Sequence, residues 1–296
     1  MNAAADRTAT RTGERTTLVA LALLFAVVYG TTAKGLALEW ASSPDASYGA
    51  ILAVVAFGLA WRRRHLVRAA ATTASGSRPG LALLAAGLLL YLVGTLGADI
   101  FLTRFSLVVT LAGSIWFVAG RSAARTLAAP LCFLALAVPL PALVVNTITL
   151  PLQLVASQLA EGMLSLARVP VFRDGNILEL RSTSLEVAEA CSGLRSLISL
   201  GAIGCLIAWA TERALWRRLA IIAAAVPVAI AFNGLRIAFT GIACETWGRH
   251  MARGGWHEFS GWVTFVVAVY ALVLFQRLLP RRRSPQSGLA PEMVSA

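Results

Sequence analysis

Residues 219–243 read LAIIAAAVPVAIAFNGLRIAFTGIA, an apolar run in which Arg236 is the only charge. A helix that crosses the hydrocarbon core of a bilayer needs about 20 mostly apolar residues, so this run predicts a membrane span. The whole chain is 58% hydrophobic and 14% charged, whereas soluble domains carry about 25% charged residues. The composition excludes a soluble globular protein, a disordered protein and a small disulfide scaffold.

Similar runs recur along the chain and predict an all-α membrane protein with about eight transmembrane helices. The expected spans are 17–36, 48–61, 81–97, 105–120, 127–145, 194–209, 219–243 and 261–278. The expected organisation is a cytoplasmic tail over 1–16, an integral membrane domain over 17–279 and a second cytoplasmic tail over 280–296. Because Glu39 and seven more spans follow the first run, we interpret it as an uncleaved helix and not as a signal peptide.

The charges separate between the two sides that this topology defines. The side with both termini carries 17 basic and four acidic residues, whereas the other side carries seven basic and ten acidic residues. Arg195 and Arg236 fall within spans. Basic residues mark the cytoplasmic side of a membrane protein, so both termini are expected in the cytoplasm. The net charge of +12 therefore reflects topology, and we expect no nucleic-acid partner.

The longest segment between expected spans is 146–193, on the extracytoplasmic side. Residues 149–168 are weakly amphipathic and are expected to lie in the membrane interface. Apolar and polar residues then alternate over 171–180 and 184–188, and Asp174-Gly175 is a turn signal. We expect a small β-hairpin on the outer surface, directly before the sixth span.

Arg236 is unusual because an arginine at the centre of a membrane helix costs roughly 2.5–3.5 kcal/mol on insertion scales. One interpretation is that its side chain extends to the outer headgroups. The other is a fixed cation that faces a polar site between helices. Asn233, one turn earlier on the same face, favours the second interpretation.

Cys191 lies at the outer end of the sixth span, where the helix N-terminus and Arg195 favour a thiolate. Glu186 and Glu189 act in the opposite direction. A cysteine is more often a small buried apolar residue, and that interpretation suits Cys132 and Cys205, which lie mid-span. A disulfide between Cys191 and Cys244 remains an alternative, because both are expected on the outer side.

His257 directly precedes the eighth span, also on the outer side. His250, in the preceding loop, is the alternative candidate, and His65 falls in a cytoplasmic arginine cluster. A single histidine is more often a surface residue than a catalytic one. However, Cys191, Arg236 and His257 are all expected at the outer ends of the last three spans, and together they supply a nucleophile, an oxyanion stabiliser and a general acid/base.

These residues resemble the signature of the exosortase/archaeosortase family. The chain has Cys191-Ser-Gly-Leu-Arg, Asn233-Gly-Leu-Arg-Ile and His257 followed by Gly261 and a span, in the family's order. Val138-Pro-Leu-Pro, Pro151-Leu-Gln and Val187-Ala-Glu-Ala agree as well, and the resemblance runs from about Pro44 to Leu279. Ser47-Tyr48-Gly49 departs from it, since many members resemble Ser-His-Gly at this point.

The resemblance implies a membrane cysteine transpeptidase with Cys191, Arg236 and His257 as catalytic residues, supported by Arg195, Asn233 and Ser192. It implies exported protein substrates that carry a C-terminal motif, one transmembrane helix and a basic tail. The acceptor nucleophile is not identified by the sequence. The protein is expected in the cytoplasmic membrane with an extracytoplasmic site, in contact with membrane lipid.

Three alternatives stay open: a glycan or lipid transferase of envelope assembly, a transporter, and a structural partner of an export complex. The inverted repeats and broken helices of transporters are not apparent in the sequence. No metal-ligand cluster, nucleotide loop or cofactor motif is apparent either, so no cofactor and no metal are expected.

Overall fold

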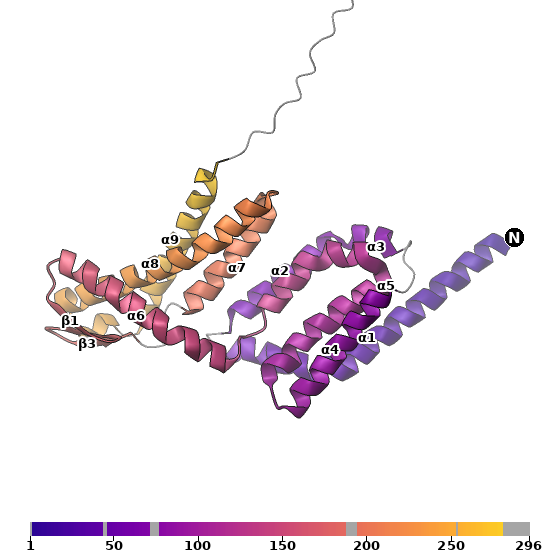
Figure 1. The fold of residues 1–296 in the computed structure, drawn as a ribbon, viewed down its shortest axis with the longest axis horizontal. Coiled ribbons are helices and arrows are strands. Elements are labelled where there is room, and N and C mark those ends of the chain that lie inside the picture. Colours follow the sequence, from indigo (N-terminus) through magenta and orange to yellow (C-terminus); the bar gives the residue numbers. More distant parts are fainter. Residues whose placement is uncertain (1, 44–45, 72–76, 188–193, 253, 281–296) are drawn as a thin grey trace, which may run out of the picture. The chain divides into compact units, whose positions relative to one another are not determined.

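The computed structural model describes residues 2–43, 46–71, 77–187, 194–252 and 254–280. Helices dominate it, with one small sheet (Figure 1). The elements in chain order are α1 (Asn2–Ser42), α2 (Tyr48–Arg62), α3 (Arg64–Ala71), α4 (Arg78–Leu96), α5 (Ile100–Leu136), α6 (Ala142–Leu166), β1 (Val171–Asp174), β2 (Ile177–Leu180), β3 (Ser184–Glu186), α7 (Leu194–Thr211), α8 (Leu215–Trp247), η2 (Arg249–Ala252) and α9 (Gly255–Leu278).

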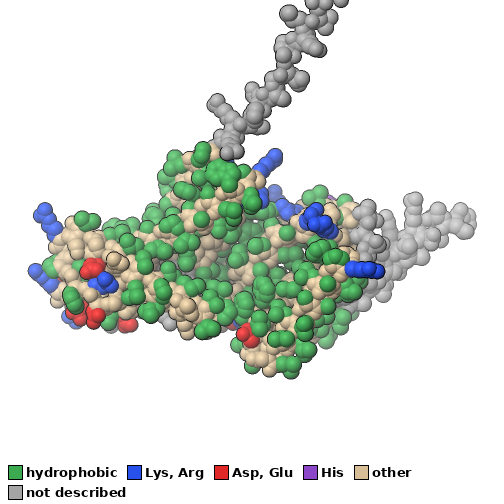
Figure 2. All heavy atoms as spheres, in the orientation of Figure 1, with side chains coloured by type: hydrophobic (Ala, Val, Ile, Leu, Met, Phe, Trp, Pro, Cys, Tyr) green, Lys and Arg blue, Asp and Glu red, His purple; other side chains and the backbone are tan. Residues whose placement is uncertain are grey.

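Six helical segments of the described part are long and apolar enough to cross a membrane, judged by length and composition. They are Ala22–Ser42, Arg78–Leu96, Ile100–Leu136, Ala142–Leu166, Leu215–Trp247 and Glu258–Leu278. Tyr48–Arg62 and Arg195–Thr211 are shorter apolar helices. Hydrophobic side chains cover the helices of the face that Figure 2 shows. The chain is thus a helical, multi-pass membrane protein, but the expected count of about eight spans is not confirmed.

The expected fourth span, 105–120, ends where the structure has a break: α5 covers 100–136, but Gly120 has the non-helical angles φ 79° and ψ 175°, so two helical segments meet there. The expected fifth span, 127–145, is corrected. The fifth expected span was placed too far along the chain, because the helix ends at Leu136 and α6 begins at Ala142. Pro139 and Pro141 lie in this break, where their missing N–H groups and fixed φ oppose a continuous helix.

The segment expected at the membrane interface, 149–168, belongs mostly to α6. Its amphipathic pattern has a structural cause: Gln153 and Ser157, one turn apart, are buried in the protein. The Ser157 hydroxyl donates to the carbonyl of Gly175, 2.9 Å away, and so links α6 to the hairpin. The polar residues of α6 therefore serve internal contacts as well as any contact with water.

The chain divides into two compact units, Met1–Thr149 and Leu150–Ala296. In the first unit, α4 packs antiparallel on the first half of α5 at very short range. A Cβ atom at Gly80, Gly87 or Gly94 would lie 2.4–2.6 Å from the nearest atom of α5. These glycines are seven residues apart, so they line one face of α4 and let the two backbones touch.

In the first unit, residues that are expected on the same side of the membrane contact each other. Arg104 forms an ion pair with Glu39, and both are expected outside. At the other end of these helices, Arg63 donates to the carbonyl of Thr126, and both are expected in the cytoplasm. The helix packing of this unit is therefore consistent with the charge-based assignment of its two ends.

In the second unit, α7, α8 and α9 lie side by side, and α6 and the sheet pack against α8 (Figure 1). The sheet is antiparallel with the order β1-β2-β3. Its first turn forms at the expected place: Asp174 pairs with Ile177, and Gly175 adopts φ +60°, which suits the first central position of a tight hairpin turn. Leu178 and Val187 from the sheet share a core with Leu164 of α6 and Ile237 of α8.

Two further contacts fix this arrangement. Glu245, near the end of α8, accepts hydrogen bonds from the backbone N–H and the hydroxyl of Ser182, at 2.8 and 2.7 Å, and so holds the β2–β3 turn. At the opposite end of the bundle, Arg217 of α8 forms a buried ion pair with Glu212 at 2.7 Å. Gln276 of α9 donates to the same carboxylate at 2.8 Å. The ends of α7, α8 and α9 are thereby joined.

Candidate active site

The structure describes the three expected catalytic residues to different extents. Arg236 lies in α8 with its side chain described. His257 lies in the first turn of α9, and only its backbone is described. Cys191 and Ser192 fall outside the described residues. All of these positions belong to the second unit, so the candidate site is built from one compact part of the chain.

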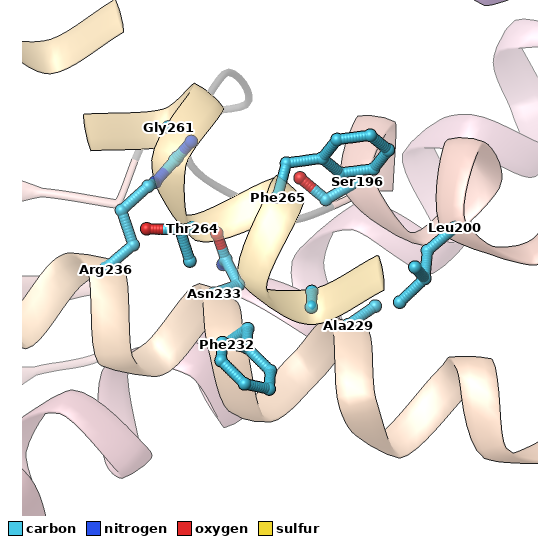
Figure 3. A pocket seen from close by; sticks show the side chains of 10 residues that line it. Ser196, Leu200, Ala229, Phe232, Asn233, Arg236, Gly261, Thr264 and Phe265 are labelled. Atoms are coloured by element: carbon cyan, nitrogen blue, oxygen red, sulfur yellow. The ribbon is translucent and has the colours of Figure 1, made fainter. Parts of the chain in front are cut away.

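Arg236 reaches across from α8 to α9 (Figure 3). A Cβ atom built on Gly261 would lie 3.1 Å from Nη1 of Arg236, so the guanidinium lies against the backbone of α9 at this glycine. The side chain is half-buried. The cation therefore occupies the space between two helices, as the interpretation of a polar site between helices requires.

Asn233 and Arg236 contribute polar groups to a small hollow, called the polar hollow below, that also has residues from two other helices and is otherwise lined by apolar side chains. Asn233 is 4% exposed. Ser196 of α7 and Thr264 of α9 lie on the other walls of the hollow (Figure 3). Three helices thus contribute an amide, two hydroxyl groups and a guanidinium to this hollow, and the guanidinium is the group among them that would stabilise a developing negative charge.

Arg236 also lines a second hollow, which involves the sheet. This hollow is bounded by Leu185, Glu186 and Val187 at the end of β3, by Thr240 of α8 and by Ala252 of η2. Glu186 supplies the only carboxylate among the residues that line this hollow. The sheet therefore forms one wall of the site, and the contact between Ser182 and Glu245 helps to hold that wall in place.

An apolar groove between α8 and α9 opens on a third side of Arg236. It has a volume of about 450 Å³, within the range of about 300–1,000 Å³ typical of ligand sites. Phe232, Arg236 and Thr264 line both this groove and the polar hollow. Arg236 is thus the residue at which three differently lined spaces meet.

The described residues on either side of Cys191 approach the same arginine. Val187 shares the second hollow with Arg236, and Ser196 shares the polar hollow with it. In α9, position 257 lies one turn before Gly261, and positions four apart share a face of a helix. Described residues before and after Cys191 in the chain, and the first turns of α9, therefore lie near Arg236.

The structure also describes the alternative residues. Cys244 is a buried free thiol in α8, outside any disulfide. His250 lies in η2 and is exposed. Arg195 is exposed and lines none of the three spaces, whereas its neighbour Ser196 does. The supporting role of Arg195 stays a prediction.

Ser196, Thr264 and Gly261 line the site, but their roles are not apparent from the sequence. Gly261 was noted only as part of the motif after His257. Helical spacing contained a signal for Thr264, which lies seven residues after His257 and three after Gly261. Among the described residues, no group of three or more histidine, cysteine or acidic side chains is placed to hold a metal ion.

Comparison with protein families gives one match. The family model of transmembrane exosortases covers residues 40–274. This range includes every residue of the candidate site. Comparison with curated proteins and with solved structures finds no match.

Proposed function

This chain belongs to the transmembrane exosortase family, and we propose that it is a cysteine transpeptidase that cleaves C-terminal sorting signals of exported proteins. Its substrates carry a short motif, one transmembrane helix and a basic tail, and they are cut at the outer face of the cytoplasmic membrane. The cleaved chain passes to an acceptor nucleophile. The observation that carries the proposal is the convergence of three spaces on Arg236, between the flanks of Cys191 and the first turns of α9.

Chain connectivity supports a nucleophile near this cation. Cys191 is four residues from Val187 and five from Ser196. An extended chain spans at most about 3.6 Å per residue, so Cys191 lies within about 14 Å of Val187 and about 18 Å of Ser196. Both of these residues line spaces that Arg236 shares, so the length of the intervening chain allows Cys191 to lie beside Arg236.

In the proposed reaction, the Cys191 thiolate attacks the carbonyl carbon of the scissile peptide bond. The Arg236 guanidinium stabilises the negative charge that develops on the carbonyl oxygen. His257 donates a proton to the departing amine as the C–N bond breaks, and a thioester with Cys191 remains. His257 then accepts a proton from the acceptor nucleophile, which attacks the thioester and releases the Cys191 thiolate.

The proposal places the sheet and the site outside the membrane and both termini in the cytoplasm. It is supported by the charge distribution of the sequence, because the loops on the side of the termini are strongly basic. Trp247 and Trp256, at the end of α8 and the start of α9, are exposed. Tryptophan is enriched at membrane–water interfaces, so these residues suit the level at which the site would open to the outside.

Co-expression with a substrate tests the proposal. The substrate is an exported reporter that ends in a motif, a span and a basic tail taken from a protein family encoded in the same genome. We expect unmodified protein to shorten the reporter and the Cys191→Ala, Arg236→Ala and His257→Ala variants to leave it uncut at equal membrane abundance. Full processing by the Cys191→Ala variant would exclude the mechanism.

A further inference from the structure

The groove between α8 and α9 has the form of a docking surface for another chain. Its lining on α9 runs from Trp256 to Val267 at intervals of three and four residues. At 1.5 Å per residue this stripe is about 16 Å long. Because the facing stripe on α8 follows the same spacing from Phe232 to Trp247, the groove runs along the helix axes, as helix-binding grooves do.

Large apolar side chains in the groove are exposed. Phe239 is 61% exposed, Phe259 56% and Trp247 63%. Aromatic side chains are the residues that contribute most to contact surfaces between chains. An apolar, elongated occupant would cover them.

A narrow polar band crosses this apolar surface. Arg236 and Thr240 of α8 and Ser260 and Thr264 of α9 supply it, with apolar residues on both sides along the groove. The hydroxyl groups of Thr240 and Thr264 donate to backbone carbonyls one turn earlier, at 2.9 and 2.7 Å. Arg236 is therefore the charged donor of the band.

This band discriminates between possible occupants. A lipid acyl chain along the groove would place methylene groups against a guanidinium, which is unfavourable for the cation. A polypeptide presents a carbonyl oxygen at every residue, and its carbonyls are unpaired where a helix gives way to an extended chain. The groove thus fits a peptide whose apolar helix ends near Arg236.

We propose that the α8–α9 groove binds the substrate at the junction between its transmembrane helix and the extended segment that is cut. The substrate helix covers the part of the groove around Phe232, Leu235 and Val267, and the extended segment passes Arg236 toward Trp247 and Trp256. This inference rests on the proposed function and extends it, because it names the surface that selects the substrate. The groove and the polar hollow share Phe232, Arg236 and Thr264 as lining residues. A substrate whose junction lies in the groove would therefore place a backbone carbonyl at the candidate site.

Two adjacent valines give a matched test of the groove. Val267 lines it and Val266 does not, and each is 45% exposed. We expect Val267→Trp to fill the groove and to lower the initial rate of reporter cleavage about tenfold, with the loss partly recovered at higher reporter expression. Val266→Trp is expected to cleave at the rate of the unmodified protein, at equal membrane abundance and equal thermal stability in detergent.

A second measurement detects docking without catalysis. A photoreactive benzoylphenylalanine replaces Phe259, which lines the groove, or Trp262, which is exposed on α9 outside it. Both proteins also carry Cys191→Ala, so the reporter stays intact. We expect a crosslink from position 259 to the residues of the reporter around the start of its helix, and no such crosslink from position 262.

The outcomes separate the groove from the chemistry. If position 259 crosslinks to the reporter but the Cys191→Ala variant still cleaves at the normal rate, the docking proposal is supported and the proposed mechanism is excluded. Crosslinks from position 259 only to lipid, to a second copy of this chain or to no partner would overturn the docking proposal. Equal cleavage by the two tryptophan variants would also overturn it, whatever the outcome for Cys191.

Discussion

Among single residues, Arg236 is the one on which the proposed mechanism depends most. Its guanidinium can direct several N–H groups in a fixed plane, whereas a lysine presents one compact charge on a flexible stem. Removal of one oxyanion donor typically costs about 10²–10³ in rate. We therefore expect Arg236→Lys to lose most of the activity of the unmodified protein even though the charge is kept, as measured by reporter cleavage over time. Near-normal cleavage by Arg236→Lys would show that a positive charge alone suffices.

Gly261 is expected to position Arg236. The Cβ atom of Gly261→Ala would lie 3.1 Å from Nη1 and would displace the guanidinium by a few tenths of an ångström or more. We expect the cleavage rate at saturating reporter to fall about tenfold, since small misplacements of a catalytic group are costly. Gly201→Ala in α7 is the control, because nothing lies within 4 Å of its Cβ position. Equal rates for both variants would remove the positioning role.

Among single residues, the sequence pointed to Arg236 but not to the residues around it. Arg236 was identifiable because a charge within an apolar span is costly and needs a reason. Ser196 and Thr264 were not, because single hydroxyl residues are common in membrane helices and their convergence depends on how α7, α8 and α9 pack.

Among the elements, the sheet is expected to shape the wall beside the site. Glu245 holds the β2–β3 turn through two hydrogen bonds to Ser182. Glu245→Gln keeps the size of the side chain but weakens its acceptor strength, so we expect faster proteolytic cutting near 181–183 and slower reporter cleavage. Glu179→Gln, an exposed acid in β2, should change neither. Identical protease patterns for the two variants would contradict this role.

The junction of α7, α8 and α9 is expected to determine the stability of the second unit. Glu212→Ala would leave Arg217 buried without its ion-pair partner, and breaking a buried pair costs about 3–5 kcal/mol. We expect a clear fall in the thermal midpoint of the protein in detergent, with Arg213→Ala, an exposed neighbour, near the unmodified value. A midpoint unchanged in Glu212→Ala would mean that packing alone holds these helix ends.

Element types were largely predictable, and element boundaries were not. Apolar runs identified the helices, and Asp174-Gly175 identified the hairpin turn, because these signals are local. The end of α5 and the start of α6 were misplaced because hydropathy continues through 137–145, whereas Pro139 and Pro141 interrupt the helix. The sequence predicts that the buried face of α6 lies in the membrane interface, because periodicity alone does not distinguish polar residues that contact water from those that contact protein.

For the whole molecule, the topology depends on α6. Its length and composition would let it cross a membrane, but from the charge distribution we expect both of its ends outside. We expect an impermeant thiol reagent to label single cysteines introduced at Leu140 and at Arg181 in intact cells, in a background without native cysteines. Labelling at only one of these positions would show that α6 crosses the membrane and would move the sheet to the other side.

A trapped intermediate would show whether Cys191 attacks the substrate beside Arg236. Purified protein in detergent is mixed with the reporter, quenched in acid before the acceptor reacts, digested and analysed by mass spectrometry. We expect a hydroxylamine-sensitive thioester that joins the new C-terminus of the reporter to Cys191, absent from the Cys191→Ala protein and strongly reduced in Arg236→Ala. A thioester on Cys244, or cleavage by the Cys191→Ala protein at the normal rate, would contradict it.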